Sequence, residues 1–145
     1  MKVTINENTK LQEDEIIINC AYMDERMRKL ADYVRQFAFS LEGELEGKFY
    51  QIPIDELYYI DTVDGKTFLY DSEHAYCSRQ TLAALEQKLI HTTFLRISKS
   101  CLMNVAQLKC VEPYVNHRMQ AELKNGERLL ISRNYIEDLK EKLRR

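Results

Sequence analysis

The chain has 145 residues, of which 45% are hydrophobic, so it can form one domain of ordinary size with an appendage. It has no run of about 18 apolar residues, and its Met1–Lys10 segment is polar, which excludes a membrane-spanning helix and a signal-peptide core. We therefore expect a cytoplasmic protein. Its formal net charge of −2 provides no general attraction to nucleic acid.

The charge is not evenly distributed along the chain. Residues 1–47 contain six lysines and arginines against ten aspartates and glutamates, whereas residues 48–145 contain fifteen against thirteen. A mildly basic part of this kind can still bind DNA if its cations converge on one edge, because the local cluster sets the field that a phosphate meets.

The cysteines and histidines are scattered and match no common metal-binding spacing. They are Cys20, Cys77, Cys101, Cys110, His74, His91 and His117. We expect reduced cysteines that are packed as small apolar residues, and neither a metal nor a cofactor. The sequence also contains no glycine-rich phosphate loop and no cluster of acid, base and nucleophile, so we expect neither an enzyme nor a small-molecule substrate.

Two strand-like pieces open the chain. They are Lys2–Asn6, in which Val3 and Ile5 alternate with polar residues, and Glu15–Cys20, which contains three consecutive isoleucines. A helix follows, with Asp24 as its candidate N-cap. Its apolar stripe has steps of four and three residues: Met23, Met27, Leu30, Val34, Phe37 and Leu41. This stripe either packs on the protein's own sheet or forms a dimer contact.

The segment Leu41–Gly47 is the expected domain boundary, since it contains two glycines and three glutamates. Residues 1–47 then form a β-β-α segment, a dimerisation or regulatory extension, and residues 48–145 form the main domain. About 47 residues are too few for an independent phosphoacceptor or ligand-sensing domain of the usual size.

The main domain begins with strands. We expect a strand at Phe49–Ile52, a single turn at Asp55–Glu56, and further strands at Leu57–Asp61, Thr67–Tyr70 and Ala75–Cys77. Asp64–Gly65 predicts a tight hairpin, beside which Lys66 either reaches a partner or only solvates the turn. A helix is then predicted from near Thr81, with Leu82, Leu85 and Leu89 on one face.

The stretch Phe94–Asn104 organises the rest of the chain. It predicts a short strand, a polar tip and an apolar return that stops at Asn104. The polar residues around the tip are Arg96, Ser98, Lys99 and Ser100. Two cations and two hydroxyls suit phosphate oxygens and base edges better than they suit bond chemistry.

Three more strands and a helix complete the expected order. The strands are Leu108–Tyr114, Arg118–Leu123 and Leu129–Ile131, with a hairpin at Asn125–Gly126 between the last two. The helix has Ile136, Leu139 and Leu143 on one face, and Asn134 with Glu137 resembles a capping box. Arg133 would precede that helix, where it binds an anion such as phosphate or is simply solvated.

These motifs together resemble the LytTR-type DNA-binding domain, the output module of many bacterial transcription regulators. The resemblance covers nearly all of residues 48–143. It rests on R-x-S-x-S-x-x-x-N in the central stretch and on I-P-I-D-E-L-Y-Y-I-D, R-Q-T-L-A-A-L-E-Q-K-L and L-K-N-G-E-R-L-L-I-S-R-N-Y, in the family's order and at similar spacing.

The resemblance implies a fold class that is mostly β with some α. It implies a β-β-β arrangement of antiparallel sheets with a C-terminal helix, which contacts DNA through loops instead of a recognition helix. The loops at Lys66, at Ser98–Lys99 and at Arg133 would enter successive major grooves, while Arg96 and Ser100 would contact the backbone. The implied DNA-binding residues are Lys66, Thr67, Arg96, Ser98, Lys99, Ser100, Arg133 and Asn134.

The sequence therefore predicts a transcriptional regulator that binds double-stranded DNA at paired promoter repeats, as a homodimer, under the control of a membrane protein or kinase pathway. Many family members have histidine where this chain has Ser98, so the recognised base sequence does not follow from the resemblance. The alternative is a protein-interaction module with no specific DNA binding. The two differ in whether Lys66, Lys99 and Arg133 share one face.

Overall fold

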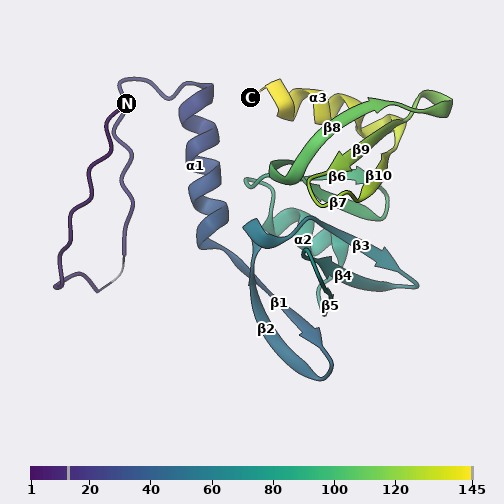
Figure 1. Ribbon diagram of the computed structural model, residues 1–145, viewed down its shortest axis with the longest axis horizontal. Coiled ribbons are helices and arrows are strands. Elements are labelled where there is room, and N and C mark those ends of the chain that lie inside the picture. Colours follow the sequence, from purple (N-terminus) through teal and green to yellow (C-terminus); the bar gives the residue numbers. More distant parts are fainter. Residues whose placement is uncertain (13, 145) are drawn as a thin grey trace.

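A computed structural model describes residues 1–12 and 14–144 (Figure 1). The helices are α1 (Glu25–Ala38), α2 (Leu82–Lys88) and α3 (Ile136–Arg144). The strands are β1 (Ser40–Leu45), β2 (Lys48–Pro53), β3 (Tyr59–Val63), β4 (Lys66–Tyr70), β5 (Ala75–Ser78), β6 (Phe94–Ser98), β7 (Cys101–Asn104), β8 (Leu108–Pro113), β9 (Met119–Leu123) and β10 (Arg128–Ile131).

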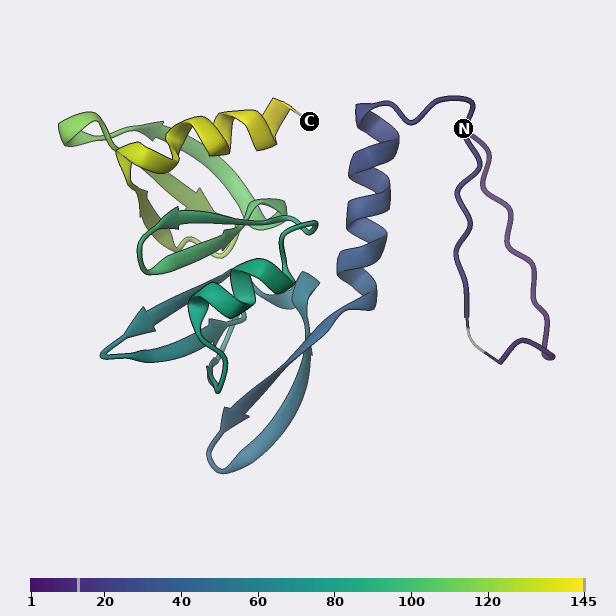
Figure 2. The ribbon, with the colours of Figure 1, turned by 180° about the vertical axis from the view of Figure 1, so that it is seen from behind.

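The strands form two antiparallel sheets. The larger has seven strands in the order β2-β1-β5-β4-β3-β7-β6, and the smaller has three in the order β10-β9-β8. Helix α2 lies against one face of the larger sheet (Figure 2), and the smaller sheet packs on the other face. The predicted fold class, mostly antiparallel β with a C-terminal helix, is confirmed. No helix within the two described ranges is long and apolar enough to cross a membrane.

Strand β7 separates two hydrophobic cores. Its Leu102 belongs to the core beneath α2, whereas Met103 belongs to the core that the smaller sheet and α3 close. Successive side chains of a strand point to opposite faces, so a strand between two cores needs apolar residues at consecutive positions. This explains why the apolar return of the central stretch does not alternate.

Asn104 ends β7 and is fully buried. Its Nδ2 donates to the carbonyl oxygen of Leu57 over 2.7 Å, and its Oδ1 accepts from Thr93 Oγ1 over 2.6 Å and from the backbone N of Ala106 over 3.1 Å. Its own backbone N donates to the carbonyl oxygen of Tyr58 over 2.9 Å. One side chain therefore joins the segment before β3, the segment before β6 and the turn after β7.

The predicted Asp64–Gly65 hairpin is present, and the helix predicted from near Thr81 has that residue as its N-cap. Asp64 and Gly65 both have positive φ, 52° and 77°, as a two-residue hairpin of type I′ requires. Thr81 caps α2, because its Oγ1 accepts from the backbone N of Ala84 over 3.1 Å. The local sequence determined both features without help from distant residues.

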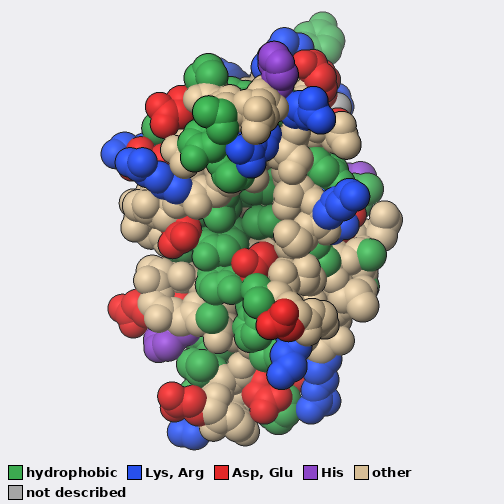
Figure 3. All heavy atoms as spheres, turned by 90° about the vertical axis from the view of Figure 1, so that its right-hand side faces the viewer, with side chains coloured by type: hydrophobic (Ala, Val, Ile, Leu, Met, Phe, Trp, Pro, Cys, Tyr) green, Lys and Arg blue, Asp and Glu red, His purple; other side chains and the backbone are tan. Residues whose placement is uncertain are grey.

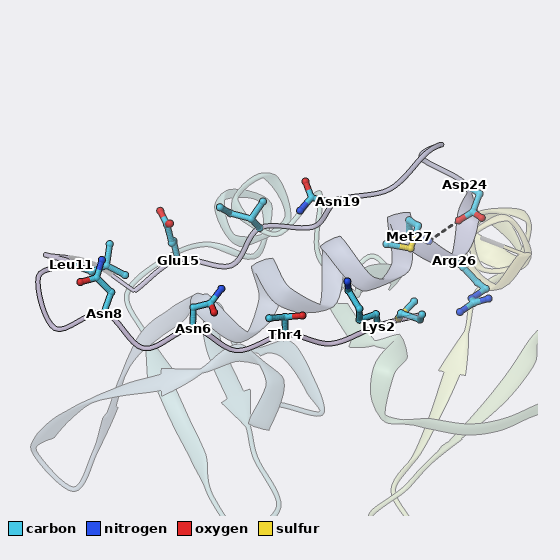
Figure 4. A pocket seen from close by; sticks show the side chains of 12 residues that line it. Lys2, Thr4, Asn6, Asn8, Leu11, Glu15, Asn19, Asp24, Arg26 and Met27 are labelled. Carbon is cyan, nitrogen blue, oxygen red and sulfur yellow. Dashed lines mark hydrogen bonds between the residues drawn. The ribbon is translucent and has the colours of Figure 1, made fainter.

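The first 22 residues differ from the prediction. The two expected strands, Lys2–Asn6 and Glu15–Cys20, are extended segments that run beside α1 but belong to neither sheet (Figures 1 and 4). Most of their β-branched side chains are exposed, as at Ile5 and Ile16, so little apolar burial is available to offset the entropy lost when two strands pair.

Helix α1 is present with its predicted cap. Asp24 Oδ1 accepts from the backbone N of Met27 over 2.9 Å (Figure 4). The helix ends at Ala38, however, and Leu41 lies in β1, where it pairs with Ile52 and is 1% exposed. The helical spacing of Leu41 was therefore coincidental, since that side chain belongs to the sheet core.

The expected linker Leu41–Gly47 is not a linker, because most of it is β1. Strand β1 pairs with β2 along its whole length and with β5 at Glu44 and Cys77. Gly43 is required there by packing: a Cβ at this position would lie 2.6 Å from Tyr76 Cβ. The sheet thus begins before residue 48, although the functional division of the chain at this point stays a prediction.

The start of the last helix also differs in detail. A 3-10 turn, Arg133–Tyr135, precedes α3, and Ser132 occupies the N-cap position of that turn. Asn134 lies inside the turn, so it cannot act as the cap that the capping-box pattern predicted. Arg133 precedes α3, as predicted, and is the first residue of this 3-10 turn.

We predict that Asn104→Ala lowers the free energy of unfolding by about 1–3 kcal/mol or more, because it leaves buried backbone groups of other segments unpaired. Chemical denaturation measures the change. Asn6→Ala is the matched control, since Asn6 is exposed in the N-terminal segment. A loss for Asn104→Ala that is no larger than the loss for the control would contradict the proposed role.

We also predict that the Cys101 thiol resists alkylation in the folded protein. Cys101 is buried in the second core, and burial and the nearby Asp61 carboxylate raise the pKa of its thiol to about 12. The reactive thiolate is therefore scarce at neutral and mildly alkaline pH. Mass spectrometry after timed alkylation should show fast labelling of the exposed Cys20 and labelling of Cys101 only after denaturation. Equal rates would contradict this.

Candidate nucleic-acid interface

Four connections gather at one side of the molecule, on the right in Figure 1. They are the β3–β4 hairpin, the β6–β7 tip, the β8–β9 turn and the connection from β10 to α3. Figure 3 views this side directly and shows a band of hydrophobic side chains with lysine and arginine side chains around it and acidic side chains on and beside it. The opposite side is occupied by α1 and the N-terminal segment.

The β6–β7 tip is a short and well-supported turn. The register shifts between Arg96 and Ser98, and Ser98 Oγ accepts from the backbone N of Ser100 over 3.2 Å. The carbonyl oxygen of Ser100 accepts from the backbone N of Thr62 over 2.9 Å, which fixes the tip to β3. Lys99 is exposed between the two serines. The backbone that bears the Lys99 side chain is therefore held in a fixed position.

Three of the four connections surround one depression of about 790 Å³. The backbone N of Ser132 donates to the carbonyl oxygen of Ile97 over 2.9 Å, and this bond holds the β10–α3 connection beside the β6–β7 tip. The residues around the depression are Ser98, Lys99, Ser100, Asn116, His117, Arg118, Ser132, Arg133, Asn134 and Tyr135. Five predicted residues, from two segments far apart in the sequence, are thus brought together.

The β8–β9 turn is the part of this site that sequence reasoning missed. Asn116 and His117 have φ of 60° and 59°, a tight turn that moves the backbone away from the strands. Arg118 is held over the Tyr114 ring, with Cζ 5.4 Å from the centroid, and its Nε donates to the carbonyl oxygen of Val115 over 3.2 Å. The available signal was the Asn-His-Arg run between two expected strands.

Lys66 lies in a second depression, of about 450 Å³, at the β3–β4 hairpin. It shares this depression with Asp64, Arg79 and other residues, and not with Lys99 and Arg133. Its neighbour Thr67 is only 4% exposed, because alternation along β4 turns that side chain into the sheet. Thr67 still lines this depression beside Lys66, so its contact with DNA stays a prediction, which its small exposed area does not favour.

Arg96 is also placed differently from the prediction. It pairs with Leu102 across β6 and β7, on the sheet face that α2 covers, and its Nη1 lies 3.8 Å from Glu86 Oε1. Its side chain is 20% exposed, and its Nε and Nη1 are buried without a hydrogen-bond partner. Arg96 thus faces α2 and not the four connections, so it has no access to a DNA backbone held there.

An aromatic and acidic cluster lies on the larger sheet, with the pair Tyr59 and Tyr70 at the end of β3 and β4 away from the Asp64–Gly65 turn. Tyr59 and Tyr70 stack with ring centroids 4.3 Å apart. Burial raises the pKa of Asp61, opposed by a hydrogen bond from Tyr70, and burial and Asp61 raise the pKa of Tyr70 to about 12. Both tyrosines therefore stay protonated and can donate hydrogen bonds across the physiological pH range.

The chemistry available at this side is hydrogen-bond donation from cations, amides and hydroxyls. Lysine, arginine, asparagine and serine donors of this kind match phosphate oxygens and the major-groove edges of base pairs. Within residues 1–12 and 14–144, no group of three or more histidine, cysteine, aspartate or glutamate side chains could hold a metal ion. The site is thus equipped for binding an anionic polymer.

Known proteins show the same sequence pattern. Residues 47–144 match a family model described as the LytTr DNA-binding domain. The sensory transduction protein LytT of Enterococcus faecalis is 27% identical over 106 residues, which are 73% of this chain and 43% of that protein. The transcriptional regulatory protein LytR of Staphylococcus aureus is 28% identical over 109 residues, 75% of this chain and 44% of that protein.

A solved structure supports the same assignment. The LytTr DNA-binding domain of a Bacillus cereus protein superposes with a TM-score of 0.68 at 22% sequence identity, covering 72% of this chain and 96% of that one, and this likeness shows the fold. The chain spans less than half the length of the curated relatives it matches. Because the family match extends over most of the residues, the chain belongs to the LytTR family of DNA-binding domains.

Proposed function

We propose that this protein is a sequence-specific transcriptional regulator that binds successive major grooves of promoter DNA through its loops. The observation that carries the proposal is the convergence of Lys99, Arg118 and Arg133, from three separate connections, on one depression. Clustered cations create a local field that the net charge of −2 does not reveal. The relatives named as transcriptional regulatory and sensory transduction proteins support the same role.

Two side chains of the depression are suited to base recognition. Arg133 can donate two parallel hydrogen bonds to O6 and N7 of guanine, and Lys99 can donate to the same acceptors. Each good pair discriminates against a wrong base by about 1–3 kcal/mol. Ser98, Ser100 and Asn134, beside them, suit phosphate oxygens and fix the register without specifying sequence.

Lys66 extends the interface to a second point. It lies in its own depression on the same side of the molecule, so it would meet a different part of the duplex from Lys99 and Arg133. This common side favours DNA over the alternative of a protein-interaction module, for which scattered cations were expected. A duplex that follows this side would contact the two depressions in succession.

Paired repeats require two copies, and α1 is the surface that we propose for their contact. The residues of α1 that face the main domain include Lys29 and Asp32, so the apolar stripe is turned elsewhere. Phe37, in that stripe, is 65% exposed. A stripe with steps of four and three residues is the pattern of a helix that packs on another helix. Control by a membrane protein or kinase pathway remains part of the proposal.

The first prediction of this proposal concerns specific binding. Purified protein mixed with sheared genomic DNA at near-physiological salt should retain a few loci that share a repeated motif, as sequencing of the retained DNA would show. Lys99→Ala with Arg133→Ala should abolish the enrichment, because it removes both base-contacting donors. Lys109→Ala is the control, since this exposed lysine lines neither depression. Retention of no DNA, or of all DNA without a motif, would overturn the proposal.

The second prediction concerns the dimer. Sedimentation of the wild-type protein at tens of micromolar should show a dimer, and Leu30→Glu with Phe37→Glu should give a monomer because it places charges in the apolar contact. Lys29→Glu, on the other side of the helix, should leave the dimer intact. A wild-type protein that is monomeric under these conditions would count against a dimer through α1.

A further inference from the structure

We infer that Arg79 is a further DNA-binding residue, which contacts the same stretch of phosphate backbone as Lys66 and is positioned for this contact by the ring of Phe49. This inference rests on the proposed function, since it assumes duplex DNA at the β3–β4 hairpin. It adds a residue that the sequence pattern did not indicate. It also assigns a role to the β1–β2 hairpin.

The register of the larger sheet places Arg79 beside Lys66. Strands β4 and β5 are antiparallel, with Thr67 opposite Ser78. Lys66 precedes Thr67 and Arg79 follows Ser78 directly after β5 ends, so both lie at the same end of this strand pair. Both residues line the depression of about 450 Å³, together with Asp64. Two cations thus lie next to each other at the hairpin.

Neither cation is neutralised by a close carboxylate. No ion pair within 4.0 Å is found for Lys66 or Arg79 among residues 1–12 and 14–144, although Asp64 lines the same depression. Adjacent like charges repel, and an anion between them relieves that repulsion. A phosphate of the DNA backbone provides this charge, and both side chains are exposed to reach it.

Phe49 gives the Arg79 guanidinium a defined position. The Cζ of Arg79 lies 4.9 Å from the centroid of the Phe49 ring, a cation–π contact that restricts a long and otherwise mobile side chain. Phe49 is 54% exposed, so its ring is not held there by core packing. An arginine that is ordered before binding loses less conformational entropy when it meets a phosphate.

The position of Phe49 depends in turn on β1. Phe49 pairs with Glu44 of β1, and Glu44 pairs with Cys77 of β5, two residues before Arg79. Strand β1 lies before residue 47, where the family match begins. The segment in front of the matched domain therefore contributes, through one aromatic ring, to the orientation of a phosphate contact.

The test is the salt dependence of DNA affinity, measured by fluorescence anisotropy on a duplex that carries the motif retained from genomic DNA. Arg79→Ala should reduce the slope of log affinity against log salt by about 1, as expected for one lost phosphate contact, and weaken binding several-fold without changing the motif. Phe49→Leu should weaken binding less than Arg79→Ala, and Phe49→Tyr should restore it. The double variant Phe49→Leu with Arg79→Ala should bind like Arg79→Ala alone.

Controls separate this inference from the proposed function and from loss of folding. Lys109→Ala removes an exposed cation elsewhere and should leave the slope unchanged. Thermal unfolding should be similar for all of these exposed substitutions. A wild-type slope for Arg79→Ala, while Lys99→Ala still lowers it, would overturn the inference and leave the proposed function standing. A wild-type affinity for Phe49→Leu would overturn the positioning role. If the wild-type protein bound no duplex, both the proposed function and this inference would be wrong.

Discussion

The hydrogen bonds of one buried side chain connect the parts of this fold. Asn104 ends a strand that is buried on both faces and pairs with three segments through its amide. Since β7 separates the two cores, its position fixes how the two sheets meet. The β6–β7 tip is continuous with this strand, so the cation at its end is carried on the most constrained part of the molecule.

A loop can recognise DNA only if the strands that carry it hold its backbone in a fixed position. A recognition helix brings its own hydrogen-bonded frame to DNA, whereas a loop needs support from the structure behind it. Here the tip is bonded to β3 and the β10–α3 connection is bonded to β6, both through backbone groups. These backbone bonds act together with the Ser98 side chain, which accepts from the backbone N of Ser100 and supports the tip from within.

The two ends of the molecule have different character. The side with the four connections has exposed cations above packed sheets, whereas α1 and the first 22 residues display apolar side chains that the domain does not cover. Under the proposed function, this separation would let DNA and a second copy bind to different surfaces. The contact of Phe49 with Arg79 would link the two ends, because Phe49 belongs to the hairpin directly after α1.

The sequence by itself determined the elements that depend on neighbouring residues. The Asp64–Gly65 turn, the Thr81 cap, the Asp24 cap and the strand–tip–strand order around Lys99 follow from local backbone preferences and periodicity. The resemblance to a family added the fold class and the importance of Arg133. The turns, the caps and the periodicity can be recognised without knowing which distant residues are in contact.

Only the tertiary structure decided which residues share a surface. Leu41 fits a helical period but is buried in a sheet, and Arg96 lies two residues before Ser98 but faces α2. Arg118 and Arg79 join the cations of the interface because strand register and packing bring their connections there. Long-range pairing and the face on which a side chain falls are collective properties of the sheets, and no local pattern specifies them.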